Sequence, residues 1–230
     1  MNWKKIPRLT ILLKWRLMPL RACLFDFDGT FADTAPGLIN AANAIYKKYD
    51  KPLLSYEQGR VISSDGTQAF LRQRFDESED NFSSLTLEFL QFYNTHILDE
   101  VALFPGISEF LSQLKDKKID WGIVTNKPRV LTETILDHFN LMGELAILIC
   151  GDDGYKPKPA PDMLNVALER LLIQSSEMIY IGDGKRDIDA AQLAGVQSVL
   201  VSYGYINPDD NYHAWGATHI IDNLQKLNFD

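Results

Sequence analysis

Short apolar segments alternate with helix-like segments along most of the chain from Ala22 onward. The pattern predicts strands at ACLFDF (22–27), DWGIVTN (120–126), LAILIC (145–150), EMIYIGD (177–183) and VQSVLVS (196–202). Because helical periodicity separates most of these strands, the expected arrangement is a parallel sheet with helices on both faces.

Residues 35–98 interrupt this alternation, because they contain only helix-like segments. These segments are APGLINAANAIYKKY (35–49), GTQAFLRQRF (66–75) and SSLTLEFLQFYNTHI (83–97), which are too many for one crossover between strands. LFPGISEFLSQLKDKK (103–118) would return the chain to the sheet, with Pro105-Gly106 at its entry. The predicted fold class is α/β, a Rossmann-like parallel sheet core (18–34 and 99–230) with an inserted small α-helical cap domain (35–98).

The first seventeen residues differ from the rest, because they hold five basic residues and no acidic one. Their apolar centre, Ile11-Leu12-Leu13, is too short for a secretory signal. A weak interfacial helix is one interpretation. The preferred one is an extension, 1–17, that the fold does not need, with Met18 as an alternative start. No stretch approaches the roughly 20 apolar residues of a membrane span, so none is expected.

Composition indicates an ordinary globular protein. Its 230 residues are 46% hydrophobic, enough for a sizeable core. A formal net charge of −8 argues against nucleic acid or an anionic membrane as a general partner. Cys23 and Cys150 fall in predicted strands, which favours buried free thiols in a reducing compartment, the cytoplasm. The four histidines, which lack ligand spacing, are interpreted as structural or surface residues: His96, His138, His213 and His219.

The first predicted strand ends in two carboxylates, Asp26 and Asp28. If the extended conformation continued through Phe27, both would project to the same side of the strand. Two like charges in an apolar setting are costly unless a cation or hydrogen-bond donors offset them. One interpretation is a polar turn at the end of the strand, since Asp-Gly-Thr is good turn chemistry. The other is a site for Mg²⁺, which prefers oxygen ligands.

Polar residues also follow the other predicted strands, at the edge of the sheet where ligands bind in such folds. These residues are Thr125-Asn126 after the second strand, Lys156 and Lys158 after the third, and Asp183 with Asp187 after the fourth. Each has a structural explanation as well: Thr125 as a helix N-cap, the lysines as solvated charges, and Asp187 as a helix-start acid. Their gathering on one edge favours a site for a cation and an anion.

Four ordered motifs, DFDGTFADT (26–34), VTN (124–126), KPKPAPDML (156–164) and GDGKRDIDAAQLAG (182–195), resemble those of the haloacid dehalogenase superfamily. The similarity extends from residue 20 to the end and is to the phosphoglycolate-phosphatase-like branch, which carries a helical cap. Phe31 departs from the Leu or Val that is commoner there, and a packing change is expected.

The resemblance implies a phosphatase that works through an aspartyl phosphate. Asp26 would be the nucleophile, and Asp28 would protonate the leaving oxygen and later deprotonate water. Mg²⁺ would be held by the Asp26 carboxylate, the Asp28 backbone carbonyl and the Asp183 carboxylate, with Asp187 supporting the site. This cation would also offset the repulsion between the paired carboxylates, Asp26 and Asp28.

The same resemblance implies that Thr125, Asn126 and Lys158 bind the phosphoryl group. Lys158 is preferred to Lys156 because the sequence that follows it continues in the register of the family.

Substrate choice is expected to lie in the cap, in the segment VISSDGTQAFLRQRF (61–75). Its candidates are the loop residues Ser63, Ser64, Asp65 and Gly66. Arg72 or Arg74 would meet a substrate carboxylate, although a solvated helix face is the favoured interpretation for both.

The implied substrate is a small phosphorylated metabolite. The tail from 201 to 222, together with WGIVTNKP (121–128), is similar to the subgroup acting on N-acetylmuramic acid 6-phosphate, and also to phosphoglycolate phosphatases. A sugar phosphomutase of the same superfamily is the chemical alternative. A phospho-receiver domain is less favoured because it lacks a cap, and a dehalogenase because it lacks the second acid. The oligomeric state stays open.

Overall fold

The computed structural model describes residues 19–78 and 81–227. The predicted N-terminal extension, 1–17, lies outside this part of the chain. No helix within it is long and apolar enough to cross a membrane.

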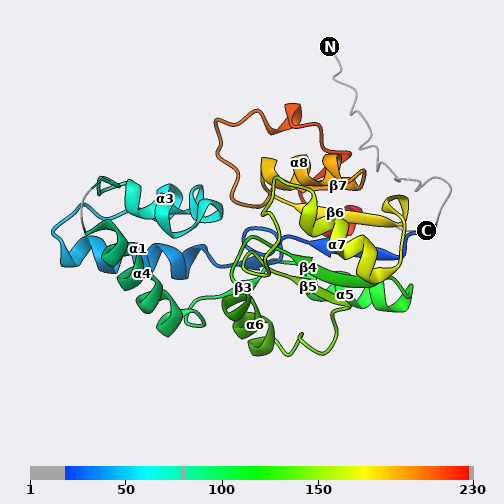
Figure 1. Ribbon diagram of the computed structural model, residues 1–230, viewed down its shortest axis with the longest axis horizontal. Helices are drawn as coiled ribbons and strands as arrows, with labels where there is room; N and C mark the ends of the chain where they lie inside the picture. Colours follow the sequence, from blue (N-terminus) through cyan, green and yellow to red (C-terminus); the bar gives the residue numbers. More distant parts are fainter. Residues whose placement is uncertain (1–18, 79–80, 228–230) are drawn as a thin grey trace, which may run out of the picture.

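A six-stranded parallel sheet forms the centre of the molecule, with the strand order β5-β4-β1-β6-β7-β8 (Figure 1). The strands are β1 (Ala22–Phe25), β4 (Asp120–Val124), β5 (Ile147–Ile149), β6 (Met178–Gly182), β7 (Gln197–Val201) and β8 (His219–Ile221). All five predicted strands are confirmed, each with slightly narrower limits. The edge strand β8 was not predicted, because three residues are too few to show a periodicity.

Helices cover both faces of the sheet, as the continuous apolar strands require. They are α5 (Ile107–Asp116) and α6 (Arg129–His138) on one face, and α7 (Asp162–Leu171) and α8 (Lys185–Leu193) on the other. Alternation along β1 produces this division: Cys23 and Phe25 pack with α5 and α6, whereas Ala22 and Leu24 join the apolar cluster with α7 and α8. Short 3₁₀ turns occur at η2 (Ser175–Glu177), η3 (Tyr212–Ala214) and η4 (Leu224–Lys226).

The inserted segment is helical and forms a separate group at one end of the molecule (Figure 1). It comprises α1 (Ala35–Lys48), α2 (Tyr56–Arg60), η1 (Ser63–Asp65), α3 (Gly66–Arg72) and α4 (Phe82–His96). The helix α2 was missed, although its capping box between Ser55 and Gln58 is a readable signal. The predicted α/β fold with a helical insertion is confirmed.

The two connections to this helical group run side by side. β2 (Ala32–Asp33) and β3 (Ala102–Leu103) pair antiparallel, with Ala32 opposite Leu103. This ribbon was not predicted, because its pairing joins residues far apart in the sequence. It places both ends of the insertion next to the edge of the sheet where β1 ends.

Phe31, the departure noted in the sequence, is fully buried beside this ribbon. Its ring stacks on Trp121 at 5.6 Å and on Phe27 at 5.8 Å between centroids. The larger side chain therefore fills space in the core, as expected, and lies in an aromatic cluster.

Candidate active site

A pocket of about 580 Å³ lies where the carboxyl ends of the strands face the helical cap. The core contributes Asp26, Asp28, Thr125, Asn126, Lys127, Lys158 and Arg186 to its lining, and the cap contributes residues 63–68 with Leu90 and Tyr93. Five of the strand-end residues singled out in the sequence therefore line one pocket, and the predicted cap loop lies on its other side; Asp183, Asp187 and Lys156 do not line it.

Three buried carboxylates cluster at this place, and one of them, Asp26, lines the pocket. Asp26, Asp183 and Asp187 each offer an oxygen, and these oxygens all lie within 4.8 Å of one another. Burial, together with the charges of Asp187 and Asp26, raises the pKa of Asp183 to about 8. Burial and the nearby Asp26 carboxylate also raise the pKa of Asp187. Both shifts arise mainly from burial, and the neighbouring carboxylates add to them.

Lys158 contacts two of these acids, and its side chain is fully buried. Its Nζ lies 2.8 Å from Asp26 Oδ1 and 2.7 Å from Asp187 Oδ1. Burial alone would lower the pKa of Lys158, but the two carboxylates more than offset this and raise it. Lys156, by contrast, is exposed. The position of Lys158 thus matches the preference for it over Lys156.

These residues fit a divalent cation. Three buried carboxylates share one lysine ammonium group, so a bound cation would favour their ionised forms. Oxygen ligands from carboxylates are those that Mg²⁺ prefers. The backbone at Gly29 approaches the Asp183 carboxylate closely. A Cβ at Gly29, whose φ is +84°, would lie 2.2 Å from Asp183 Oδ2.

Asp28 lines the same pocket, but its side chain is not part of the carboxylate cluster. β1 ends at Phe25, and the chain turns after Phe27, whose carbonyl accepts from the N–H of Phe31 at 2.9 Å. The premise that the extended conformation continues through Phe27 is therefore wrong. Asp28 Oδ1 instead accepts from Lys127 Nζ at 2.9 Å and from Thr34 Oγ1 at 2.6 Å. A contact from the Asp28 backbone carbonyl to a metal stays a prediction.

Thr125 and Asn126 lie at the end of β4 and line the pocket. Thr125 is not the N-cap of α6, which begins at Arg129; its Oγ1 accepts from the N–H of Lys127 at 3.2 Å. The Asn126 side chain bonds both ways to the backbone of Lys158, donating to its carbonyl at 3.0 Å and accepting from its N–H at 2.9 Å. Asn126 therefore ties the third motif to the second.

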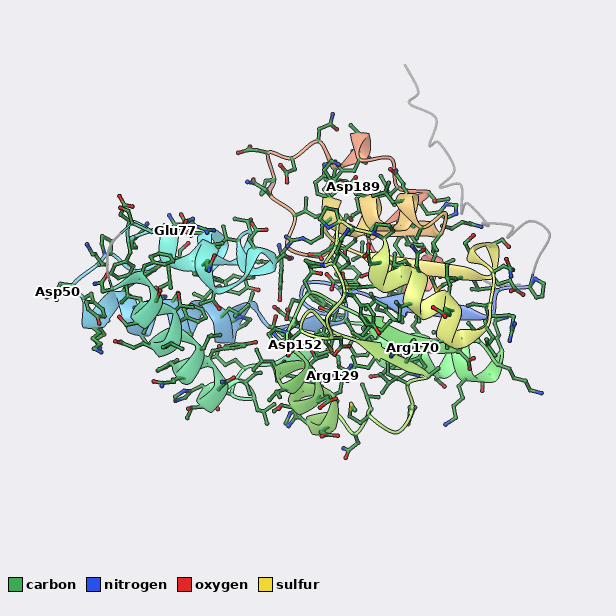
Figure 2. The ribbon with its side chains drawn as sticks, viewed as in Figure 1. Asp50, Glu77, Arg129, Asp152, Arg170 and Asp189 are labelled. Atoms are coloured by element: carbon green, nitrogen blue, oxygen red, sulfur yellow. The ribbon has the colours of Figure 1, made fainter. Side chains whose placement is uncertain are left out.

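The segment that carries Thr125 to Lys127 is anchored at its far end by Arg129. The backbone N–H of Arg129 donates to Asp152 at 2.8 Å, and its guanidinium pairs with Asp153 at 2.6 Å. Figure 2 shows Arg129 and Asp152 near the start of α6. This anchor was not predicted, because the contact joins the start of α6 to the loop that follows β5.

The residues of the predicted cap loop make different contacts. Ser63 is buried and donates to the Gly59 carbonyl at 2.9 Å, so its hydroxyl is used inside the cap. The buried Ser64 hydroxyl has no hydrogen-bond partner among the described residues and belongs to the pocket lining. Asp65 forms an ion pair with Arg186 of the core at 2.6 Å. Gly66 has a φ of +77°, which favours glycine at this turn.

Arg72 and Arg74 lie outside the pocket lining. Arg72 pairs with Glu77 at 2.8 Å, and Arg74 donates to the Pro52 carbonyl at 2.9 Å. Figure 2 shows Glu77 in the cap group. The favoured interpretation, a solvated helix face, agrees with the exposed Arg72 at the end of α3. It does not hold for Arg74, which follows the helix, is half-buried and lies 5.6 Å from the centroid of the Tyr46 ring.

The tail contributes a contact that sequence reasoning missed. The N–H of Tyr205 donates to Asp183 Oδ2 at 2.6 Å, and the Tyr205 hydroxyl accepts from the N–H of Thr34 at 2.7 Å and donates to Asp33 at 2.8 Å. Thr30 Oγ1 donates to the other Asp183 oxygen at 3.2 Å. Tyr205 thus connects the acid cluster to the start of the cap.

Other sequence candidates are accounted for. Cys23 and Cys150 are buried free thiols, as predicted, and burial raises the pKa of each. None of the four histidines lines the pocket described here, in agreement with structural or surface roles: His96, His138, His213 and His219.

The fold and site together define a Rossmann-like α/β enzyme whose clustered aspartates lie under a helical cap. Residues 23–201 match the family model for haloacid dehalogenase-like hydrolases. The chain belongs to this family, and the predicted resemblance and the prediction of an enzyme are confirmed.

Two relatives support the family assignment, and a solved structure supports the fold. The chain is 36% identical over 212 residues to an N-acetylmuramic acid 6-phosphate phosphatase of Pseudomonas putida, covering 91% of this chain and 95% of that protein. It is 35% identical over 208 residues to a phosphoglycolate phosphatase of Xanthomonas campestris, covering 90% and 94%. A crystal structure from Haemophilus somnus, described as a predicted phosphoglycolate phosphatase, has a similar fold, with a TM-score of 0.80, 23% identity and coverage of 89% and 95%.

Proposed function

We propose that this protein is a Mg²⁺-dependent phosphatase that hydrolyses a small phosphomonoester through an aspartyl phosphate on Asp26. The observation that carries the proposal is the buried cluster of Asp26, Asp183 and Asp187 with Lys158, of which Asp26 and Lys158 line a pocket shared by core and cap. The phosphatase relatives support the reaction class.

Asp26 is held for attack on phosphorus. Its Oδ1 accepts from the N–H of Phe27 at 2.7 Å and contacts Lys158 Nζ at 2.8 Å, while no described residue donates to its Oδ2. That oxygen would form the bond to phosphorus as the bond to the leaving oxygen breaks. Asp28 would give a proton to that leaving oxygen and later take one from the water that attacks the aspartyl phosphate. Free phosphate and the Asp26 carboxylate result.

The remaining residues stabilise the transferring phosphoryl group. Thr125 would donate a hydroxyl hydrogen bond and Lys158 an ammonium group, so that developing charge meets fixed donors. Asn126 would contact phosphate only through its second amide proton, since its other bonds hold Lys158. Mg²⁺, when bound to the aspartates, offsets the repulsion between the anionic nucleophile and the anionic phosphate.

The size of the pocket favours a substrate larger than phosphoglycolate. Its volume of about 580 Å³ falls within the range of pockets that enclose drug-sized ligands. A phosphorylated amino sugar such as N-acetylmuramic acid 6-phosphate would fill it, with the phosphate on the core and the sugar against the cap. Phosphoglycolate is the second candidate, on the strength of the similar relatives.

Release of inorganic phosphate from four compounds tests the proposal: N-acetylmuramic acid 6-phosphate, phosphoglycolate, N-acetylglucosamine 6-phosphate and glucose 6-phosphate. We expect Mg²⁺-dependent release, fastest from the first compound, and its loss in excess chelator. Asp26→Asn should be inactive, whereas Asp116→Asn, at an exposed acid on α5 outside the pocket lining, serves as the matched control. An isomeric sugar phosphate without free phosphate would instead indicate a mutase.

A further inference from the structure

Lys127 is a buried cation of the pocket to which the proposed mechanism gives no role. It lies between β4 and α6, and its side chain is only 4% exposed. Its Nζ is 2.9 Å from Asp28 Oδ1 and 3.0 Å from the hydroxyl of Tyr93, and it lies 5.0 Å from the centroid of the Tyr93 ring. Tyr93 belongs to α4 of the cap and is itself buried. Lys127 therefore joins the cap to Asp28.

The contacts of Asp28 are all on one of its two oxygens. Oδ1 accepts from both Lys127 Nζ and Thr34 Oγ1, at 2.9 and 2.6 Å. No residue within 19–78 or 81–227 donates to Oδ2, although the carboxylate lines the pocket. Rotation of the carboxyl group would break both contacts, so the pair of donors on Oδ1 fixes the direction of Oδ2.

We propose that Lys127 is a positioning residue: it holds Oδ1 of Asp28 so that Oδ2 faces the leaving oxygen of the substrate. The Tyr93 hydroxyl holds the Lys127 ammonium in turn. This proposal rests on the proposed role of Asp28 as proton donor. In the first step Asp28 Oδ2 gives its proton to the leaving oxygen as the P–O bond breaks, and in the second it receives a proton from water. Lys127 keeps its own protons throughout.

The burial of Lys127 favours positioning over a loose surface pairing. Two of its three N–H donors are used by Asp28 and Tyr93, and the side chain has almost no solvent around it. Proton transfer is sensitive to small displacements of the donor, because the donor must lie within hydrogen-bond reach of the oxygen. A contact that fixes one carboxylate oxygen is thus expected to affect the steps that need a proton.

Two aryl phosphates of similar shape separate this role from a general one. 4-Nitrophenolate leaves without protonation, whereas phenolate is a poorer leaving group that benefits from an acid. Lys127→Met should lower kcat/KM for phenyl phosphate about 10–100-fold and for 4-nitrophenyl phosphate less than about 3-fold. The loss on phenyl phosphate is a part of the rate enhancement that an acid catalyst provides, which is about 10²–10⁴-fold. Asp28→Asn should show the same selectivity with a larger loss. Lys156→Met, at an exposed lysine, should change neither.

Tyr93→Phe tests the cap contact and keeps the assignment testable if Lys127→Met does not fold. It removes one hydroxyl and should lower kcat/KM for phenyl phosphate alone, by a few-fold. Lys127→Arg, which retains a donor to Oδ1, should recover activity on phenyl phosphate relative to Lys127→Met. In the Lys127→Met protein, Tyr93→Phe should cause no further loss, because the hydroxyl acts through the ammonium.

Three results would overturn the assignment. Equal losses on both aryl phosphates in Lys127→Met, with Asp28→Asn still selective, would mean that Lys127 is structural or binds the phosphoryl group. A loss confined to substrates with a carboxylate, such as phosphoglycolate against glycerol phosphate, would mean that Lys127 binds the substrate directly. If Asp28→Asn itself lacked selectivity, the proton-donor role in the proposed function would fail and this assignment with it.

Discussion

Replacing Lys158 by Ala removes the cation that contacts both Asp26 and Asp187. The side chain is fully buried and makes three polar contacts, at 2.8 Å to Asp26, 2.7 Å to Asp187 and 2.7 Å to the Tyr180 hydroxyl. The variant therefore leaves clustered carboxylates without their ammonium partner in a buried space. Breaking a buried ion pair by removing one partner typically costs about 3–5 kcal/mol.

The same substitution removes a fixed donor to the transferring phosphoryl group. Loss of one such donor typically lowers kcat about 10²–10³-fold, which corresponds to about 2.7–4 kcal/mol. Lys156→Ala is the matched control, because it changes an exposed lysine two residues away. Surface substitutions of this kind usually alter stability by no more than about 0.5 kcal/mol.

The two effects are measured separately. Urea unfolding with a chelator, and again with Mg²⁺, gives the free energy of unfolding of both variants and the parent protein. Steady-state phosphate release gives kcat/KM. We expect Lys158→Ala to lose stability and activity, and the stabilisation by Mg²⁺ to be larger in this variant, because the cation then meets more uncompensated charge. A greater loss of activity in Lys156→Ala, or a loss below about 3-fold in Lys158→Ala, would refute the reasoning.

Three other predictions follow from the site. Asp26→Asn should abolish phosphate release, because an amide is no nucleophile, while Asp28→Asn should lower kcat about 10²–10⁴-fold; rapid-quench detection of the phosphoenzyme checks both. Since the pKa of Asp183 is raised from 3.8 to about 8, the metal-free protein binds this proton more tightly when folded, and its melting temperature should fall as pH rises from about 4 to 8. Thermal melts in chelator, in which Mg²⁺ should restore more stability at pH 8 than at pH 5, measure this. Asp65→Asn, which weakens the ion pair with Arg186, should change relative kcat/KM among phosphomonoesters with Mg²⁺ affinity unchanged; one common factor on every substrate would argue against selection by the cap.

The sequence by itself determined the framework of the site. Periodicity located five strands and the helical insertion, because burial on both faces of a parallel sheet requires long apolar runs. It also located Asp26, Thr125 and Asp183, since side chains at the carboxyl ends of parallel strands must meet at one edge. The roles of these residues came from the family motifs.

The sequence also contains a local signal for the helix α2, which was not predicted. The capping box of Ser55 and Gln58 predicts the start of a helix, and α2 begins there. The edge strand β8 gave no such signal, because its three residues derive their conformation from pairing with β7.

Only the tertiary structure decided which polar residues act together. Lys127 contacts Asp28 across 99 residues of the sequence, Arg186 contacts Asp65 across 121, and the Tyr205 hydroxyl contacts Asp33 across 172. The pattern of neighbouring residues in the sequence does not predict such contacts, because they form only when the sheet and the cap pack around a shared pocket. The family register already favoured Lys158 over Lys156, and the structure supplies the physical difference: folding buries Lys158 among carboxylates and leaves Lys156 exposed.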